Sequence, residues 1–191
     1  MRLFVAVEIA PAVLAQVSEC SRELRRRTEE LAPGSRVTWV PQDRLHITVR
    51  FIGQADATQA AAIDAALEPP LTTRRFDVAL TGVGAFPERG RPRVLWAGVV
   101  TGEQALGRLE QEVSSRMDRC GVAREERPYR PHVTLARVRE SGGLRTESLV
   151  AGLADRAFGC SPVDAITLFE SRPSSAGHVY VPLRRTRLGP A

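Results

Sequence analysis

The chain has 191 residues, of which 43% are hydrophobic and 26% are charged, so its composition excludes a disordered or fibrous protein. All 27 basic residues are arginines and outnumber the 22 acidic residues, which gives a net charge of +5 and a pI near 10.0. The absence of lysine excludes a lysine-dependent phosphate loop, a Schiff base and a lysyl-nucleotide intermediate, while the excess of arginine predicts an anionic partner, nucleic acid first, or else a solvated basic surface.

The cysteines and the apolar runs indicate the cellular location that we expect for the protein. Cys20, Cys120 and Cys160 form no CxxC pair, so neither a disulfide framework nor a zinc site is encoded, and we expect a cytoplasmic location. The apolar run at residues 3–7 is too short for a signal peptide or a membrane span, so we expect no membrane association.

Hydrophobic periodicity predicts helices and strands interspersed along the whole chain. The expected strands cover residues 3–9, 37–40, 45–52, 76–80, 94–100, 132–138, 158–163, 166–169 and 179–183. The expected helices cover residues 11–31, 56–67, 101–120 and 146–154. Asp56 with Gln59, and Thr101 with Gln104, are typical of capping boxes at two helix starts. The Gly/Pro/Arg-rich turn at residues 87–92 predicts an exposed basic loop.

Two of the three histidines lie in the same pattern, His46-Ile47-Thr48 and His132-Val133-Thr134, each within an alternating stretch. Two such matches among three histidines arise by chance with a probability of about 0.01. In a strand, residues i and i+2 point the same way about 6.6 Å apart, so each imidazole has a hydroxyl beside it. The third histidine, His178, lacks this threonine, and we interpret it as structural or peripheral.

This pair of motifs predicts an acid–base site if folding brings the two segments, 86 residues apart, to one cleft. Imidazole donates or accepts protons near neutral pH, so one ring could deprotonate a water while the other protonates a departing oxygen. Threonine hydroxyls and an arginine would hold the phosphate oxygens. This chemistry requires neither a metal nor another cofactor.

The chain resembles the 2H phosphoesterase superfamily, specifically the RNA 2′,3′-cyclic phosphodiesterases also called 2′-5′ RNA ligases. The resemblance rests on RLFVAV at residues 2–7, VTWV at 37–40, LHITVRFIG at 45–53, FP at 86–87, RVLW at 93–96, RPHVTLAR at 130–137 and GHVY at 177–180. It implies one bilobal α+β domain over residues 1–191, with two pseudo-symmetric lobes. Each lobe would have an antiparallel sheet flanked by helices, and the active-site cleft would lie between them.

The resemblance also implies roles for individual residues. His46 would be the general acid on O3′ and His132 the base for water, with Thr48, Thr134 and Arg137 binding the phosphate. Phe51 would stack on the terminal base.

Strand alternation opposes two of these assignments. Phe51 and Arg137 both lie five positions after their histidine, so they reach the cleft only if the strand twists, bulges or ends there. Arg50 shares the face of His46 by the same alternation and is either a phosphate or backbone contact or a surface charge.

We therefore predict a metal-independent hydrolase that converts RNA 2′,3′-cyclic phosphate ends, tRNA fragments among them, to 2′-phosphates, with weak reverse 2′-5′ ligation. We expect it to act as a monomer. One alternative keeps the mechanism but takes 2′-5′ oligoadenylate or a small cyclic nucleotide as substrate. Another is a non-catalytic RNA-binding module, which the low aromatic content of 5% disfavours.

Overall fold

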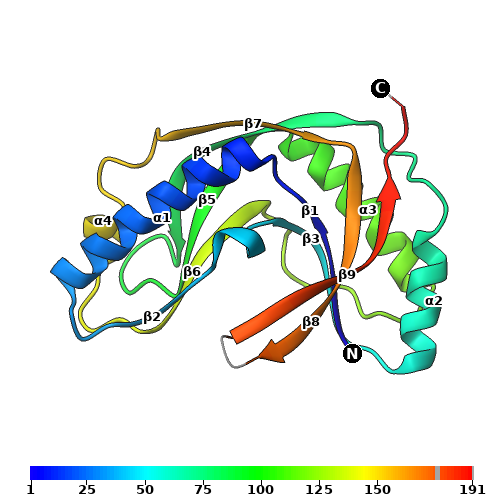
Figure 1. Cartoon of the computed structure of the whole chain (residues 1–191), viewed down its shortest axis with the longest axis horizontal. Helices are drawn as coiled ribbons and strands as arrows, with labels where there is room; N and C mark the ends of the chain where they lie inside the picture. The colour runs from blue at the N-terminus through cyan, green and yellow to red at the C-terminus, as the bar shows by residue number, and fades with distance from the viewer. Residues whose placement is uncertain (175–176, 191) are drawn as a thin grey trace.

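The structure, a computed structural model, describes residues 1–174 and 177–190 and has an α+β fold built on one curved antiparallel sheet (Figure 1). The strands are β1 (Arg2–Val7), β2 (Arg36–Trp39), β3 (Ile47–Gln54), β4 (Phe76–Phe86), β5 (Val94–Thr101), β6 (His132–Glu140), β7 (Ala157–Val163), β8 (Ala165–Ser174) and β9 (Gly177–Arg187). The helices are α1 (Pro11–Leu31), α2 (Ala57–Leu67), α3 (Glu103–Asp118) and α4 (Thr146–Leu149), with a 3-10 turn at Gln42–Arg44.

The sheet has two halves that meet at one point. Its strand order is β7-β4-β5-β6-β3-β1-β8-β9, and β2 pairs with the outer part of β6. The halves are joined between β6 and β3, where Ile47 lies opposite Val133. The predicted α+β fold with two lobes is thus confirmed, with the difference that the two antiparallel sheets continue into one another.

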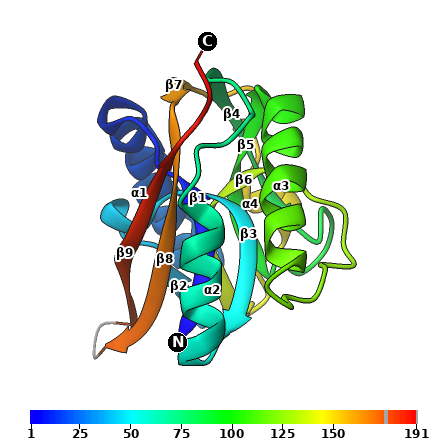
Figure 2. The same cartoon turned by 90° about the vertical axis from the view of Figure 1, so that its right-hand side faces the viewer.

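The helices cover the halves in a crossed arrangement, which Figures 1 and 2 show from two sides. Helix α1 follows β1 but packs on β7 and α4 in the other half, while α3 follows β5 but packs on β3 and α2. The alternating apolar residues of the strands face these helices and form one continuous hydrophobic core with them. The opposite face of the sheet is left free where the halves meet.

Of the two helix starts that the capping boxes predict, one is confirmed and one is wrong. The Asp56 carboxylate accepts a 2.8 Å hydrogen bond from the Gln59 backbone N–H, as the capping box predicts. The predicted Thr101 cap is wrong, because β5 extends through Thr101 and Gly102 is the residue before α3. Gly102 has a φ of +82°, and a Cβ there would lie 2.5 Å from the Asp77 carbonyl oxygen, so the turn requires glycine.

Strand and helix lengths also differ from the prediction. Strand β3 begins at Ile47 and not at residue 45, because the 3-10 turn occupies the chain just before it. Strand β4 continues to Phe86, six residues beyond the predicted end. Strands β8 and β9 form a long hairpin. The edge strand β9 contains too many charged residues for alternation to predict its full length. Helix α4 ends at Leu149, five residues before the predicted end.

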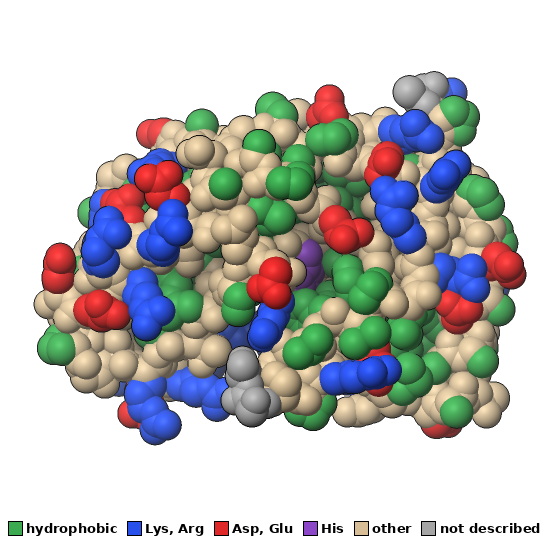
Figure 3. Space-filling model, in the orientation of Figure 1, with side chains coloured by type: hydrophobic (Ala, Val, Ile, Leu, Met, Phe, Trp, Pro, Cys, Tyr) green, Lys and Arg blue, Asp and Glu red, His purple; other side chains and the backbone are tan. Residues whose placement is uncertain are grey.

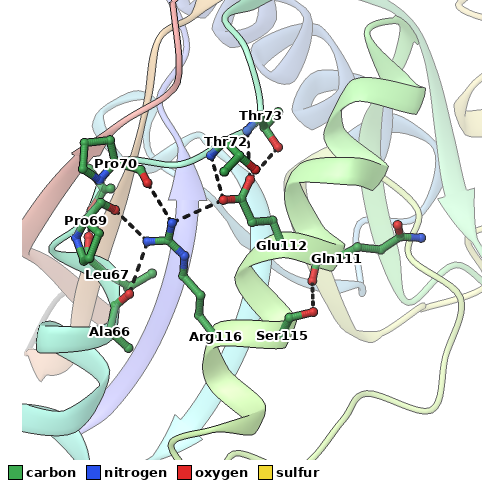
Figure 4. A network of polar contacts seen from close by, with 11 residues as sticks. Ala66, Leu67, Pro69, Pro70, Thr72, Thr73, Gln111, Glu112, Ser115 and Arg116 are labelled. Atoms are coloured by element: carbon green, nitrogen blue, oxygen red, sulfur yellow. Dashed lines mark hydrogen bonds and ion pairs between the residues drawn. The ribbon is translucent and has the colours of Figure 1, made fainter.

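A polar network fixes α3 to the segment that connects α2 with β4 (Figure 4). The buried Arg116 guanidinium donates to the carbonyl oxygens of Ala66, Pro69 and Pro70 at 2.6 to 3.2 Å. Beside it, the Glu112 carboxylate accepts hydrogen bonds from the backbone N–H groups and a hydroxyl of the next segment, residues 72–73. Pro69 and Pro70 prevent this linker from forming a helix or strand of its own. The bonds to Arg116 and Glu112 therefore satisfy backbone N–H and carbonyl groups that regular secondary structure would otherwise pair.

No helix in the described ranges is long and apolar enough to cross a lipid bilayer.

Candidate active site

The two histidine motifs come together where the half-sheets meet. The antiparallel pair of Ile47 with Val133 places Thr48 level with His132, and His46 level with Thr134, on one face. A cleft of about 800 Å³ lies there, and five of the six predicted residues line it: Thr48, Phe51, His132, Thr134 and Arg137. The sixth, His46, adjoins the cleft with its Nε2 3.1 Å from the Thr48 hydroxyl oxygen.

The two imidazoles are held in the same way. The Nδ1 of His46 lies 2.7 Å from the Arg44 carbonyl oxygen, and the Nδ1 of His132 lies 2.7 Å from the Arg130 carbonyl oxygen. A carbonyl oxygen only accepts, so each Nδ1 carries the proton and donates it. Nε2 is therefore the ring atom that can transfer a proton in each histidine, that of His46 being in contact with the Thr48 hydroxyl. In both motifs the fixing carbonyl is two residues earlier in the chain.

Aromatic rings pack against both histidines. His46 stacks on Phe4 at 5.0 Å between ring centres and meets the edge of Tyr180 at 5.4 Å, while His132 meets the edge of Phe86 at 5.4 Å. Burial lowers the pKa of both histidines, against the opposing effect of the carbonyl hydrogen bonds. The positive charge of Arg137 lowers both pKa values further, and that of His132 lowers the pKa of His46.

Two β-bulges bring Phe51 and Arg137 into the cleft. In β3, Ala6 pairs with Thr48 but Val5 pairs with Arg50, so one extra residue lies between them. In β6 the same irregularity falls between the partners of Leu95 and Trp96, at residues 134–136. Each bulge reverses the alternation after the threonine, so Thr48 and Phe51 share one face, as do Thr134 and Arg137. Phe51 is 43% exposed, and Arg2 lies over its ring with the guanidinium carbon 5.2 Å from the ring centre.

The same bulge turns Arg50 away from the cleft, so the alternation that placed it on the face of His46 is wrong. Arg50 is only 3% exposed, which also excludes the surface-charge interpretation. Its Nη2 donates to the Ala123 carbonyl oxygen at 2.5 Å, and its Nη1 is 4.0 Å from the Glu110 carboxylate. Arg50 thus ties β3 to the segment that follows α3.

Comparison with known proteins shows the family of this chain. The family model described as the 2'-5' RNA ligase superfamily matches residues 11–173. The chain belongs to the 2′-5′ RNA ligase superfamily. An RNA 2',3'-cyclic phosphodiesterase from Archaeoglobus fulgidus is 32% identical over 184 residues, which are 96% of this chain and 98% of the relative. One from Aeropyrum pernix is 36% identical over 142 residues, or 74% and 80% of the two chains.

Solved structures agree with the fold of this superfamily member. E. coli LigT superposes with a TM-score of 0.76 at 25% identity, covering 98% of this chain and 96% of LigT. Its complex with 3'-AMP superposes with a TM-score of 0.75 at the same identity. The family predicted from the sequence is therefore confirmed, and the names of the relatives agree with the predicted class of enzyme.

This 2′-5′ RNA ligase superfamily member also has cleft residues that the sequence motifs did not predict. Tyr129 donates its hydroxyl to the Thr48 carbonyl oxygen at 3.0 Å, and burial raises the pKa of the phenol. Three further arginines line the cleft, Arg93, Arg127 and Arg130, against two carboxylates, Glu110 and Glu125. Arg93 and Arg130 lie within stretches that carry the family resemblance, but no role followed for them. For Arg127 the arginine-rich composition was the only signal, because a loop whose position depends on tertiary packing carries no periodicity.

Two other features of the described residues bear on the predictions. His178 is exposed on β9, outside the cleft lining, and its Nδ1 lies 3.1 Å from the Ser171 hydroxyl oxygen. Within residues 1–174 and 177–190, no group of three or more His, Cys, Asp or Glu side chains is placed to hold a metal ion.

Figure 3 shows that one face of the molecule is hollowed near its centre, and a histidine side chain is visible inside the hollow.

Proposed function

We propose that the protein is an RNA 2′,3′-cyclic phosphodiesterase that opens the cyclic phosphate at an RNA 3′ end to a 2′-phosphate. The observation that carries this proposal is the pair of imidazoles, each with Nδ1 bonded to a backbone carbonyl, with His132 lining the cleft and His46 beside the cleft residue Thr48. The names of the relatives from Archaeoglobus fulgidus and Aeropyrum pernix support the same activity.

In the proposed reaction the phosphorus atom lies between the two rings. His132 accepts a proton at Nε2 from a water molecule, whose oxygen attacks phosphorus. His46, protonated at Nε2, gives this proton to O3′ as the bond between phosphorus and O3′ breaks. One P–O bond forms and one breaks, and the proton balance is restored when His46 is reprotonated and His132 loses its proton to solvent.

The remaining cleft residues would bind the substrate. Hydroxyls of Thr48 and Thr134 and the guanidinium of Arg137 would donate to the non-bridging oxygens and offset the charge that develops on them. Phe51 would stack on the terminal base with the ring face that Arg2 does not cover. A sugar hydroxyl attacking in place of water would form a 2′-5′ linkage by the same steps, which accounts for a weak ligase activity.

The proposal extends to the setting of the enzyme. Every group assigned to the reaction comes from a single chain, so we propose that a monomer is active and that residues 1–191 act as one bilobal unit. We place it in the cytoplasm, where RNA fragments with cyclic phosphate ends, such as those of tRNA, would be its substrates.

Substitution of the histidines tests this function. His46→Ala and His132→Ala should each lower the turnover of an RNA oligomer with a 2′,3′-cyclic phosphate end by a factor of about 10² to 10⁴, the usual contribution of a general acid or base. Binding of the oligomer should change only a few-fold. Turnover is measured by separating 2′-phosphate from 3′-phosphate products, with EDTA present.

His178→Ala is the matched control, because this exposed histidine lies outside the cleft lining and should be dispensable. A wild-type protein that forms no 2′-phosphate, or histidine variants that keep full turnover, would contradict the proposal. The same assay on a cyclic mononucleotide and a 2′-5′ oligoadenylate ranks the alternative substrates.

A further inference from the structure

The turn between β4 and β5, residues 87–93, carries positive charge that the catalytic steps do not use. We call it the arginine turn. Its side chains Arg89, Arg91 and Arg93 are exposed, and among the described residues none of the three has an ion-pair or side-chain hydrogen-bond partner. Pro87 and Arg93, at the two ends of the turn, line the cleft. The turn therefore rises from the rim of the site.

Hydrogen bonds to α4 hold the arginine turn in place. The Gly90 backbone N–H donates to the Glu147 carboxylate at 3.1 Å, and its carbonyl oxygen accepts from the Thr146 N–H at 2.9 Å. Gly90 has a φ of +86°, a conformation that side-chain-bearing residues rarely adopt. Glu88, the one carboxylate of the turn, is 3.4 Å from Arg130 of the cleft lining. The turn thus presents its free arginines from a fixed backbone.

On the other half of the sheet, three of the four arginines of β8 and β9 are neutralised, in contrast. Arg172 pairs with Glu170 at 2.7 Å, Arg184 pairs with Asp64 at 2.5 Å, and Arg185 pairs with Asp164 at 2.7 Å. At the arginine turn three arginines outnumber two carboxylates, Glu88 and Glu147. An anionic strand that leaves the cleft therefore meets a net positive charge there, and mostly neutralised arginines along β8 and β9.

We propose that the arginine turn binds phosphodiester groups of the RNA strand just upstream of the terminal nucleotide, which makes polynucleotide ends better substrates than 2′,3′-cyclic mononucleotides. The inference rests on the proposed function. A cyclic phosphate terminates the 3′ end, so the strand continues from the cleft only in the 5′ direction and any further contact falls on upstream phosphates. Guanidinium groups match the paired oxygens of a phosphodiester, and they bind it without reading sequence.

A charge-matched pair of double variants tests the turn. Arg89→Ala with Arg91→Ala should raise KM for a six-nucleotide RNA with a 2′,3′-cyclic phosphate end about 10-fold, while kcat/KM for a 2′,3′-cyclic mononucleotide stays within about 2-fold. The dependence of log KM on log salt concentration should become shallower by about 0.7 for each phosphate of the single strand that the variant no longer binds. Arg22→Ala with Arg26→Ala, an exposed pair on α1, removes the same charge and should leave both substrates unchanged.

Three outcomes would overturn the inference: an unchanged KM for the oligomer, an equal loss on the mononucleotide, or the same rise in KM from the α1 control. Fluorescence anisotropy with an oligomer that ends in 2′-phosphate keeps the test independent of turnover. If the wild type converts neither substrate, the proposed function fails, yet the turn is still tested by a 10-fold weaker binding of this oligomer to the variant. Equal binding by variant and wild type would then reject the turn as well.

Discussion

Single residues in this site owe their chemistry to the carbonyl groups and rings around them. The carbonyls of Arg44 and Arg130 fix the tautomer of the two histidines, and burial lowers both pKa values below the usual value of about 6.5. The reaction proposed above needs one neutral and one protonated imidazole. Because both pKa values are lowered, the free enzyme has one neutral and one protonated imidazole at a lower pH than two free imidazoles would.

This shift predicts the pH profile of kcat/KM, which reports the free enzyme. As pH rises above both pKa values, the acid loses its proton and kcat/KM falls. As pH drops below both, the base becomes protonated and kcat/KM falls again. Because both pKa values are lowered, we expect a bell with its maximum below about pH 6.5, where the limbs belong to the coupled pair. Steady-state rates on a cyclic-phosphate oligomer across the acid and neutral range measure it.

Arg137→Gln provides the internal check, since removing this positive charge favours the protonated imidazoles and should move the maximum toward higher pH. His178→Ala should leave the maximum in place. A wild-type profile that rises steadily through neutrality would contradict the two-histidine assignment.

At the scale of elements, the helix α3 is positioned by one buried arginine. Arg116→Ala should lower the free energy of unfolding by about 3 to 5 kcal/mol, because three carbonyl oxygens and the Glu112 carboxylate lose a buried charged partner. Urea unfolding followed by circular dichroism measures the loss. Arg108→Ala, on the exposed side of the same helix, should cost less than about 0.5 kcal/mol. Equal stability of Arg116→Ala and wild type would show that the linker does not need the network.

The elements also show what the sequence could predict. Strict alternation was enough to place His46 with Thr48 and His132 with Thr134, because each pair is only two positions apart in extended chain, although β3 itself begins at Ile47. It failed at Phe51, Arg137 and Arg50, because a bulge is defined by the register of β1 against β3 and of β5 against β6. The register depends on partners far away in the chain, and only the family resemblance indicated that Phe51 and Arg137 reach the site.

For the whole molecule, the path of the chain connects the two lobes more strongly than the sheet does. Among the described residues, a single backbone pair, Ile47 with Val133, joins β3 to β6. The helices cross, however: α1 leaves one half to cover the other, and α3 does the reverse. Neither half can bury its apolar face without a helix that the other half supplies, so the catalytic geometry depends on both folding together.

We therefore predict that the protein unfolds in one cooperative transition. Both tryptophans, Trp39 on β2 and Trp96 on β5, lie in the half that contains β6, so their fluorescence reports that half alone. Circular dichroism reports all helices, including α2 and α3 on the other half. Coincident urea transitions by the two probes are expected, because loss of either half removes the helix that covers the other. Separate transitions would show that the halves are independent domains, and a cleft between independent domains would not keep the two imidazoles at a fixed distance.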